Sequence, residues 1–177
     1  MANVDSKLGL RPIEGQNLRL KIFPVNAADS GAALFKNSPV KLVASGGVAA
    51  NSTDSVNFVG TVLDLYDSNK VPVSYLTAST DGYVGATTNP NLRYQIQCSG
   101  TLTASSVGDC ANLIATAGDT TLGQSRYELS STLLGASASG QMRIIGLVDR
   151  PDNAWGAQND VVVIAAHHAF MSTPVGV

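Results

Sequence analysis

The stretch Asn57-Phe-Val-Gly-Thr-Val-Leu-Asp-Leu-Tyr66 is the clearest guide to the fold of this chain. Its residues follow a period-two pattern, and the sequence Asp67-Ser-Asn69 comes directly after it. A period of two places successive side chains on opposite faces of a β-strand. Asp, Ser and Asn favour turns because their side chains hydrogen-bond to the nearby backbone. The stretch therefore predicts a β-strand that ends in a turn.

Further strand patterns lie on both sides of this stretch. Residues Leu92–Cys98 alternate apolar with polar side chains, which predicts an antiparallel strand with one wet face. Residues 18–23 alternate in the same way before Pro24 closes the strand, and one of the two alternating sets is Leu18, Leu20 and Ile22. More strands are expected at Pro39–Val43, Val71–Leu76 (an edge strand, because of Pro72), Tyr127–Thr132, Met142–Val148 and Val161–Ala166. Residues Asn112–Ala117 fit either a strand or one helical turn.

The pattern as a whole predicts an all-β protein, a small antiparallel β-barrel or sandwich with an extended N-terminal arm and long loops. No stretch has about twelve residues of helical periodicity with a cap, whereas about eight short strands alternate with turn signals. Residues 1–16 lack a periodic apolar pattern and are expected to form the arm, and residues 17–177 a single barrel-like domain. Long loops are expected around Ser45–Ser55, Thr77–Asn91 and Leu134–Ser139.

The composition favours a protein that assembles with others. Charged residues make up 14% of the chain, against about 25% in typical soluble proteins. A surface with few charges associates readily with other proteins, which suits a protein whose surface becomes an interface. The formal net charge is −2, and the cations are scattered, so no nucleic-acid partner is expected.

Cysteine content and hydropathy indicate the cellular compartment in which the chain folds. The two cysteines, Cys98 and Cys110, fall short of a disulfide framework and are expected to be reduced structural thiols, although their spacing leaves a bridge between them open. The longest apolar run, Val161–Ala166, is far shorter than the ~20 residues that a membrane span needs. Met1–Gly9 has no apolar stretch of the kind that a signal peptide contains. We therefore expect folding in a reducing cytoplasm, without a membrane partner.

No pattern of catalytic or metal-binding residues stands out. His167 and His168 are adjacent, so on a strand they point to opposite faces and do not make a ligand pair. Asp64 and Asp67 have ordinary turn placement, and Cys98 lacks a base or cation nearby in sequence. We therefore predict a non-enzyme with no catalytic residue, no cofactor and no metal. Trp155, the lone Trp, has two interpretations: a cap on one end of the barrel, or an anchor in an interface.

Several short motifs occur in an order that is similar to one family. The opening Asp5-Ser-Lys-Leu-Gly-Leu-Arg-Pro-Ile13 resembles the start of the capsid decoration (cement) proteins of tailed phages, which are encoded beside the major capsid protein. The further resembling segments span the chain to about Phe170 and are Ala33–Val40, Phe58–Val62, Arg93–Gln97, Ala104–Gly108, Asn112-Leu113, Thr120–Ser125, Met142–Val148, Pro151–Ala154 and Val161–His168. One departure is Asn37-Ser38, where the family usually has Gly-Asp.

This resemblance implies a virion protein on the outer capsid surface that clamps neighbouring capsid subunits. Its expected partners are the major capsid protein and other copies of itself, with a trimer as one option. We hypothesise that Gly9, Leu10, Arg11 and Pro12 anchor the arm to the capsid, with Leu10 in an apolar recess and Arg11 beside a capsid carboxylate. Trp155 is a further contact candidate.

Three alternatives stay open at this point. A head-surface or tail-tip module that binds host glycans would use aromatic residues in loops, here Tyr83 and Trp155. An enzyme is disfavoured because no acid–base pair is assembled. The major coat protein itself is disfavoured because the chain is short and lacks the long helix of the common tailed-phage coat.

Overall fold

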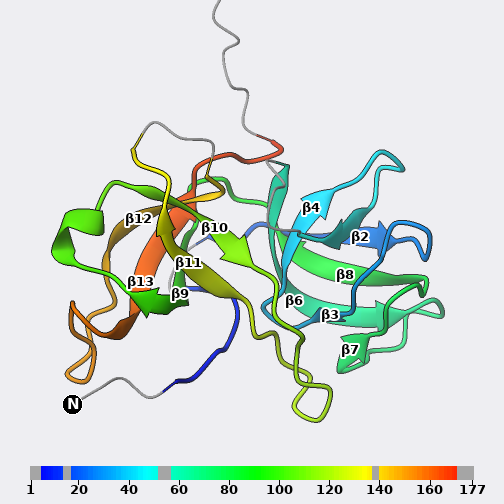
Figure 1. The fold of residues 1–177 in the computed structure, drawn as a ribbon. Coiled ribbons are helices and arrows are strands. Elements are labelled where there is room, and N and C mark those ends of the chain that lie inside the picture. Colours follow the sequence, from blue (N-terminus) through cyan, green and yellow to red (C-terminus); the bar gives the residue numbers. More distant parts are fainter. Residues whose placement is uncertain (1–4, 14–16, 52–56, 137–139, 171–177) are drawn as a thin grey trace, which may run out of the picture.

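The protein is described by a computed structural model over residues 5–13, 17–51, 57–136 and 140–170. These residues form thirteen short strands and one 3-10 turn, η1 (Ala104–Ser106), with no α-helix among them. The all-β prediction is therefore confirmed. The strands gather into two lobes that lie side by side (Figure 1).

The first lobe, the barrel lobe, is a closed five-stranded barrel. Its strands are β9 (Arg93–Thr101), β10 (Cys110–Ile114), β11 (Glu128–Leu133), β12 (Met142–Leu147) and β13 (Gln158–Ala165). They follow the order β9-β11-β10-β12-β13, and β13 pairs back to β9, which closes the sheet. The pairs are antiparallel except β9 with β11, which run parallel. The open choice at 112–117 is thus resolved in favour of a strand, β10, that ends at Ile114.

The alternating residues of β9 show why this stretch forms a barrel strand. Leu92, Tyr94, Ile96 and Cys98 are all at most 1% exposed and belong to the barrel core, as their alternation predicted. Burying an aliphatic or aromatic side chain completely stabilises the fold by about 1.5–3 kcal/mol. The apolar set of the period-two pattern is therefore the set that packs in the barrel core.

The second lobe is built around a five-stranded sheet with its own core. Its strands follow the order β2 (Leu20–Val25), β8 (Gly82–Thr87), β6 (Phe58–Asp67), β4 (Pro39–Leu42) and β5 (Val48–Ala50). A short pair, β3 (Leu34–Phe35) with β7 (Tyr75–Leu76), lies beside it. The two cores meet within β6, because Phe58 belongs to the barrel core while Val59 belongs to the second core.

The expectation of a long loop at Thr77–Asn91 is wrong, because β8 lies within it. This strand is central, with β2 on one side and β6 on the other (Figure 1). The glycines of β8 interrupt the apolar alternation, so the sequence pattern did not indicate a strand. Close packing nevertheless requires them. A Cβ on Gly82 would lie 2.7 Å from the Tyr66 carbonyl oxygen. Strand β5 likewise lies within the loop expected at Ser45–Ser55.

Strand β2 alternates as expected, but its wet face is the one that carries leucine and isoleucine. Leu20 and Ile22 are 52% and 62% exposed, whereas Phe23 and Val25 are buried in the second core. Pro24 lies within the strand rather than closing it, which an edge strand tolerates because its outer N–H needs no partner. The apolar face of Leu20 and Ile22 is therefore exposed.

Candidate functional site

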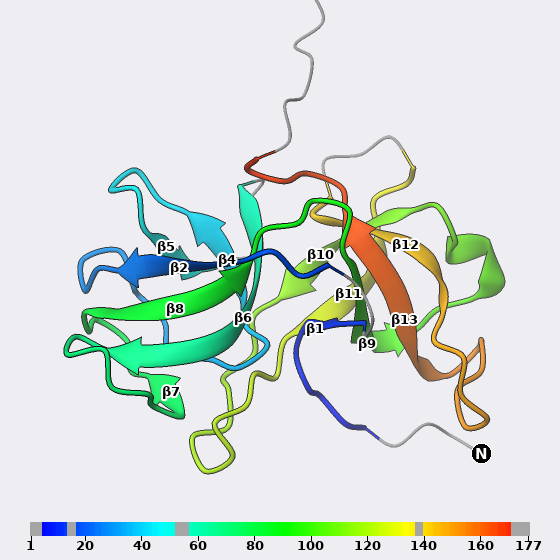
Figure 2. The same cartoon turned by 180° about the vertical axis from the view of Figure 1, so that it is seen from behind.

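The N-terminal arm is the first candidate site, and the structure folds residues 5–13 against the chain's own barrel. Its strand β1 (Arg11–Pro12) pairs with β9, and Figure 2 shows this blue segment running between the two lobes. Leu10 is 0% exposed and belongs to the barrel core. Its N–H donates to the Asn37 carbonyl oxygen at 2.9 Å, and its carbonyl accepts from Thr61 Oγ1 at 2.8 Å. The arm thereby joins both lobes.

Two ion pairs fasten the arm to the barrel. Lys7 Nζ lies 3.1 Å from Glu128 Oε2, and Arg11 Nη2 lies 3.9 Å from Asp160 Oδ2. The carboxylate side chains are only 7% and 8% exposed, and Arg150 contacts Asp160 as well, at 2.9 Å. A buried carboxylate costs several kcal/mol unless it is paired. The arm therefore compensates charges that the barrel buries.

These contacts correct the expected role of the arm anchor. The apolar recess for Leu10 and the carboxylate for Arg11 both exist, but this chain itself supplies them. Gly9 is packed inward at φ +71°, where an added Cβ would lie 2.6 Å from the Asn37 carbonyl oxygen, and Pro12 lies half-buried in β1. A sequence pattern shows that a segment needs a recess, not which protein provides it. Leu10 is not accessible to another protein in this conformation.

Burial and the nearby carboxylates keep the Cys98 thiol protonated. Burial, followed by the negative charges of Asp160 and Glu128, raises the pKa of Cys98 to about 12. Burial also lowers the pKa of Arg11, against the raising effect of Asp160 and with a lowering effect of Arg150. Since the thiolate is the nucleophile, Cys98 is unreactive near neutral pH. Cys98 and Cys110 are buried free thiols, as predicted.

His168 packs against the barrel core rather than in a ligand cluster. His168 is 6% exposed, packs edge-on against Phe58 at 5.9 Å, and accepts the Phe170 N–H through Nδ1 at 3.1 Å. Burial lowers its pKa, and the nearby Val59 backbone partly opposes this. Among the described residues, no group of three or more His, Cys, Asp and Glu side chains comes together to hold a metal.

Trp155 lies half-buried against the barrel core. This contact agrees with the interpretation of Trp155 as a cap on the barrel, which stays a prediction. Its role as an interface anchor stays a prediction, because part of the ring surface is still exposed.

Residues 119–124, the Leu122 loop, form a rigid tip beside the arm. Asp119 and Gln124 exchange two backbone hydrogen bonds of 2.8 and 3.1 Å. Asp119 Oδ1 accepts the N–H groups of Thr121 at 2.9 Å and Leu122 at 3.1 Å, and its Oδ2 pairs with Arg126 at 2.7 Å. The hydrogen bond from Leu122, followed by that from Thr121 and the pair with Arg126, lowers the pKa of Asp119. The loop is thus pre-organised, and it presents Leu122 with 74% of its surface exposed.

The Leu122 loop and the arm form one surface although they are far apart in sequence. They share a hollow of about 400 Å³, lined by Asp5–Leu8 from the arm and by Asp119, Leu122, Gln124 and Arg126 from the loop. Gln124 Nε2 donates to the Leu8 carbonyl oxygen at 3.5 Å. Sequence reasoning missed this juxtaposition, because only the tertiary fold brings the two segments together.

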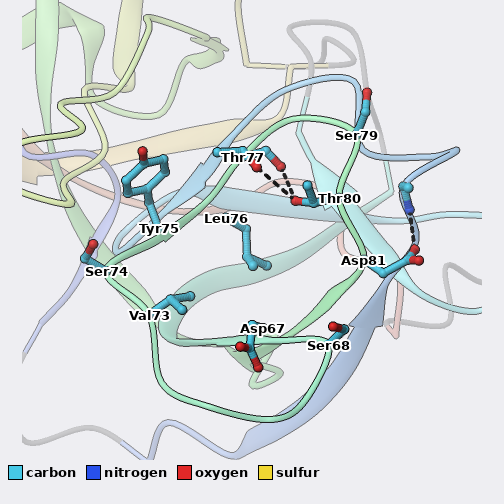
Figure 3. Close-up of a pocket in the computed structure, with 11 residues that line it drawn as sticks. Asp67, Ser68, Val73, Ser74, Tyr75, Leu76, Thr77, Ser79, Thr80 and Asp81 are labelled. Atoms are coloured by element: carbon cyan, nitrogen blue, oxygen red, sulfur yellow. Dashed lines mark hydrogen bonds between the residues drawn. The ribbon is translucent and has the colours of Figure 1, made fainter.

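Another hollow, of about 830 Å³, lies beside β7 and is lined mainly by turn and loop residues (Figure 3). Its two carboxylates are already used. Asp67 Oδ1 accepts the N–H groups of Asn69 and Val71 at 2.9 and 2.8 Å, as expected for a turn, and Asp81 Oδ1 accepts that of Ala27 at 2.8 Å. These polar groups stabilise turns and offer no assembled site.

A third hollow, of about 430 Å³, lies on the outer face of the second lobe. Here we call it the tyrosine hollow, and its lining residues are Ile22, Pro24, Tyr66, Lys70 and Tyr83. Tyr83 was expected in a loop, but it lies in β8 directly opposite Tyr66 of β6. The pairing register that makes them neighbours is not visible in the sequence.

Comparison of the chain with protein-family models found no match, and comparison with curated proteins found none either. None of the described residues forms a helix with the length and apolar character needed to cross a membrane. The resemblance to capsid decoration proteins therefore stays a prediction.

Proposed function

We propose that this chain is a structural virion protein that binds the outer surface of a phage capsid and stabilises the shell by bridging neighbouring major capsid subunits. The observation that carries the proposal is the convergence of the arm and the Leu122 loop. Both belong to segments that resemble the decoration family, 5–13 and 120–125, and the fold places them around one hollow. If these segments bind the partner that the decoration family has in common, the major capsid protein would contact this surface.

The physics of this surface supports binding rather than catalysis. Leu122 is the most exposed of the large apolar side chains in the described residues, and its loop is held by the Asp119 carboxylate. An apolar side chain on a rigid loop binds without a large loss of conformational entropy. Many such contacts on one lattice add up, so each need be only modestly tight. A protein that binds only the assembled shell stabilises it by mass action.

The arm has a changed role in this proposal. Leu10 is buried in the chain's own core and does not insert into the capsid. Instead, the arm forms part of a preformed binding surface, with residues 5–8 lining its hollow. The partners are the major capsid protein and further copies of the chain, a trimer being one option.

The test is co-sedimentation of the purified protein with undecorated, expanded capsids, followed by heating of bound and bare shells. We expect saturable binding at a fixed ratio to coat subunits, and survival of decorated shells at higher temperature. Leu122→Ser should weaken binding by at least about tenfold, as for an interface hot spot. Leu134→Ser is the matched control, because Leu134 is also exposed, at 40%, but follows the opposite end of β11. Absence of saturable binding by the unchanged protein would refute the proposal.

A further inference from the structure

Four ring-bearing residues lie in one row across the outer face of the second lobe. Pro24 of β2 pairs with Tyr83 of β8, and Tyr83 pairs with Tyr66 of β6. Tyr66 in turn forms an isolated bridge with Pro72. Neighbouring strands lie about 4.8 Å apart, so directly paired side chains are in contact distance. The register thus places four ring-bearing residues, two of them aromatic, next to one another.

The row faces outward. The residues that alternate with it on the three strands are Phe23, Val84 and Leu65, which are at most 5% exposed and form part of the second core. Because successive side chains point to opposite faces, Pro24, Tyr83 and Tyr66 point away from that core. Together with Ile22 they line the tyrosine hollow. Its volume is within the range of about 300–1,000 Å³ typical of small-molecule sites.

A cation is held at the edge of this hollow. The Lys70 ammonium lies 5.4 Å from the centroid of the Tyr83 ring. Lys70 has a φ of +63°, in a turn that Asp67 fixes by accepting the N–H groups of Asn69 and Val71. Within the described part of the chain, no carboxylate lies at ion-pair distance from this ammonium. The positive charge is therefore positioned but not compensated.

We propose that the tyrosine hollow binds an acidic sugar, a pyranose ring that carries a carboxylate. The electron-rich faces of the tyrosine rings attract the weakly positive C–H face of a pyranose. The Lys70 ammonium forms a charge-assisted hydrogen bond to the carboxylate. The Tyr66 and Tyr83 hydroxyls, which can both donate and accept, bind the sugar hydroxyls. The two tyrosines and Lys70 thus each have a counterpart on such a ligand.

An extended peptide fits this face less well. A peptide that adds to a sheet needs an open backbone edge, whereas β8 and β6 under the tyrosines are paired on both sides and only the outer edge of β2 is open. Only side chains are offered here, as a flat platform with one cation. This activity goes beyond capsid stabilisation and does not depend on it. A particle that displays many copies would turn weak sugar binding into attachment to acidic glycans.

The experiment is an NMR titration of the free ¹⁵N-labelled protein with N-acetylneuraminic acid and glucuronic acid, and with glucose as the neutral comparison. We expect saturable shifts of amides in β6, β8 and the 67–71 turn, with a Kd of about 0.1–10 mM for the acidic sugars. Glucose should bind at least about fivefold more weakly, since it lacks the carboxylate. Equal binding of glucose, or no saturable shift with either acid, would overturn the proposal.

Three variants locate the site. Tyr83→Thr removes a ring but keeps a strand-favouring residue, and it should abolish the shifts. Lys70→Gln should weaken binding of the acids about fivefold and leave glucose unaffected. Lys21→Gln is the matched control, because Lys21 also lies over an aromatic ring, Phe23 at 5.0 Å, yet outside the hollow. Should Tyr83→Thr and Lys70→Gln abolish capsid binding while sugar binding is unaltered, the face is a protein-docking surface and the proposal is wrong.

Discussion

At the scale of single residues, Gly9 illustrates how the arm seat depends on backbone geometry. Its φ of +71° is unfavourable for other residues, and an added Cβ would meet the Asn37 carbonyl oxygen at 2.6 Å and the Ser125 Cβ at 2.7 Å. We therefore expect Gly9→Ala to destabilise the protein by about 1–3 kcal/mol, measured by urea unfolding. Gly31→Ala is the control, because nothing lies within 4 Å of its Cβ position. Equal stability of both variants would show that Gly9 is not packed against Asn37 and Ser125 in solution.

Leu10 and Leu20 make a second matched pair. Leu10 is 0% exposed in the barrel core, while Leu20 is 52% exposed on the wet face of β2. Truncation of a buried leucine leaves a cavity, so Leu10→Ala should cost about 2–5 kcal/mol of the free energy of unfolding. Leu20→Ala should change it by no more than about 0.5 kcal/mol. A Leu10→Ala protein as stable as Leu20→Ala would mean that the arm does not occupy this seat in solution.

His168 predicts a pH dependence of stability. Burial lowers its pKa in the folded protein below the ordinary value of 6.5, so protonation favours the unfolded chain. The stabilising contribution is present above pH 6.5 and is lost as the pH falls below it. Urea unfolding between pH 7.5 and 5 should show this loss in the unchanged protein and less of it in His168→Gln. His167→Gln serves as control and should keep the full slope.

At the scale of elements, the arm behaves as a structural part of the barrel. Removing residues 1–13 would empty the Leu10 seat and leave the buried Glu128 carboxylate without Lys7. We expect this deletion to lower the stability of the barrel by several kcal/mol. That outcome differs from a detachable arm, whose loss would leave the barrel intact. Adding a synthetic peptide of residues 5–13 should raise the Tm of the shortened protein as the peptide concentration increases.

At the scale of the whole molecule, a buried polar network couples the two lobes. Gln141 Nε2 donates to Asn51 Oδ1 at 3.2 Å, Tyr127 donates to the Asn51 carbonyl oxygen at 2.8 Å, and Leu113 N–H donates to Gln141 Oε1 at 2.8 Å. Burial raises the pKa of Tyr127 to about 12, in keeping with a hydroxyl that stays protonated as a donor. Polar groups that lose their partner inside a protein cost about 1–3 kcal/mol each.

This network predicts one cooperative unfolding transition. Fluorescence of Trp155 reports on the barrel lobe, whereas far-ultraviolet circular dichroism reports on both lobes. The two signals should coincide in the unchanged protein and separate in Gln141→Leu, which cannot hydrogen-bond to Asn51. Separate transitions in the unchanged protein would show that the lobes unfold independently.

The sequence by itself determined the all-β class and the position of most strands. Period-two alternation is local, and stretches such as Leu92–Cys98 show their buried face directly because their polar and apolar sets differ clearly. Alternation does not indicate the buried face where that contrast is absent. In β8 glycine and alanine replace larger apolar residues, and in β2 both faces carry apolar side chains, so the pattern could not say which face is inward.

The tertiary structure alone decided the candidate sites. The seat of Leu10 and the partner of Arg11 depend on where residues about 150 positions away in the chain fold back, as Asp160 does. The contact between the arm and the Leu122 loop, and the row from Pro24 to Pro72, depend on strand order and register. Sequence encodes these only through the summed free energy of many long-range contacts, which no local pattern displays.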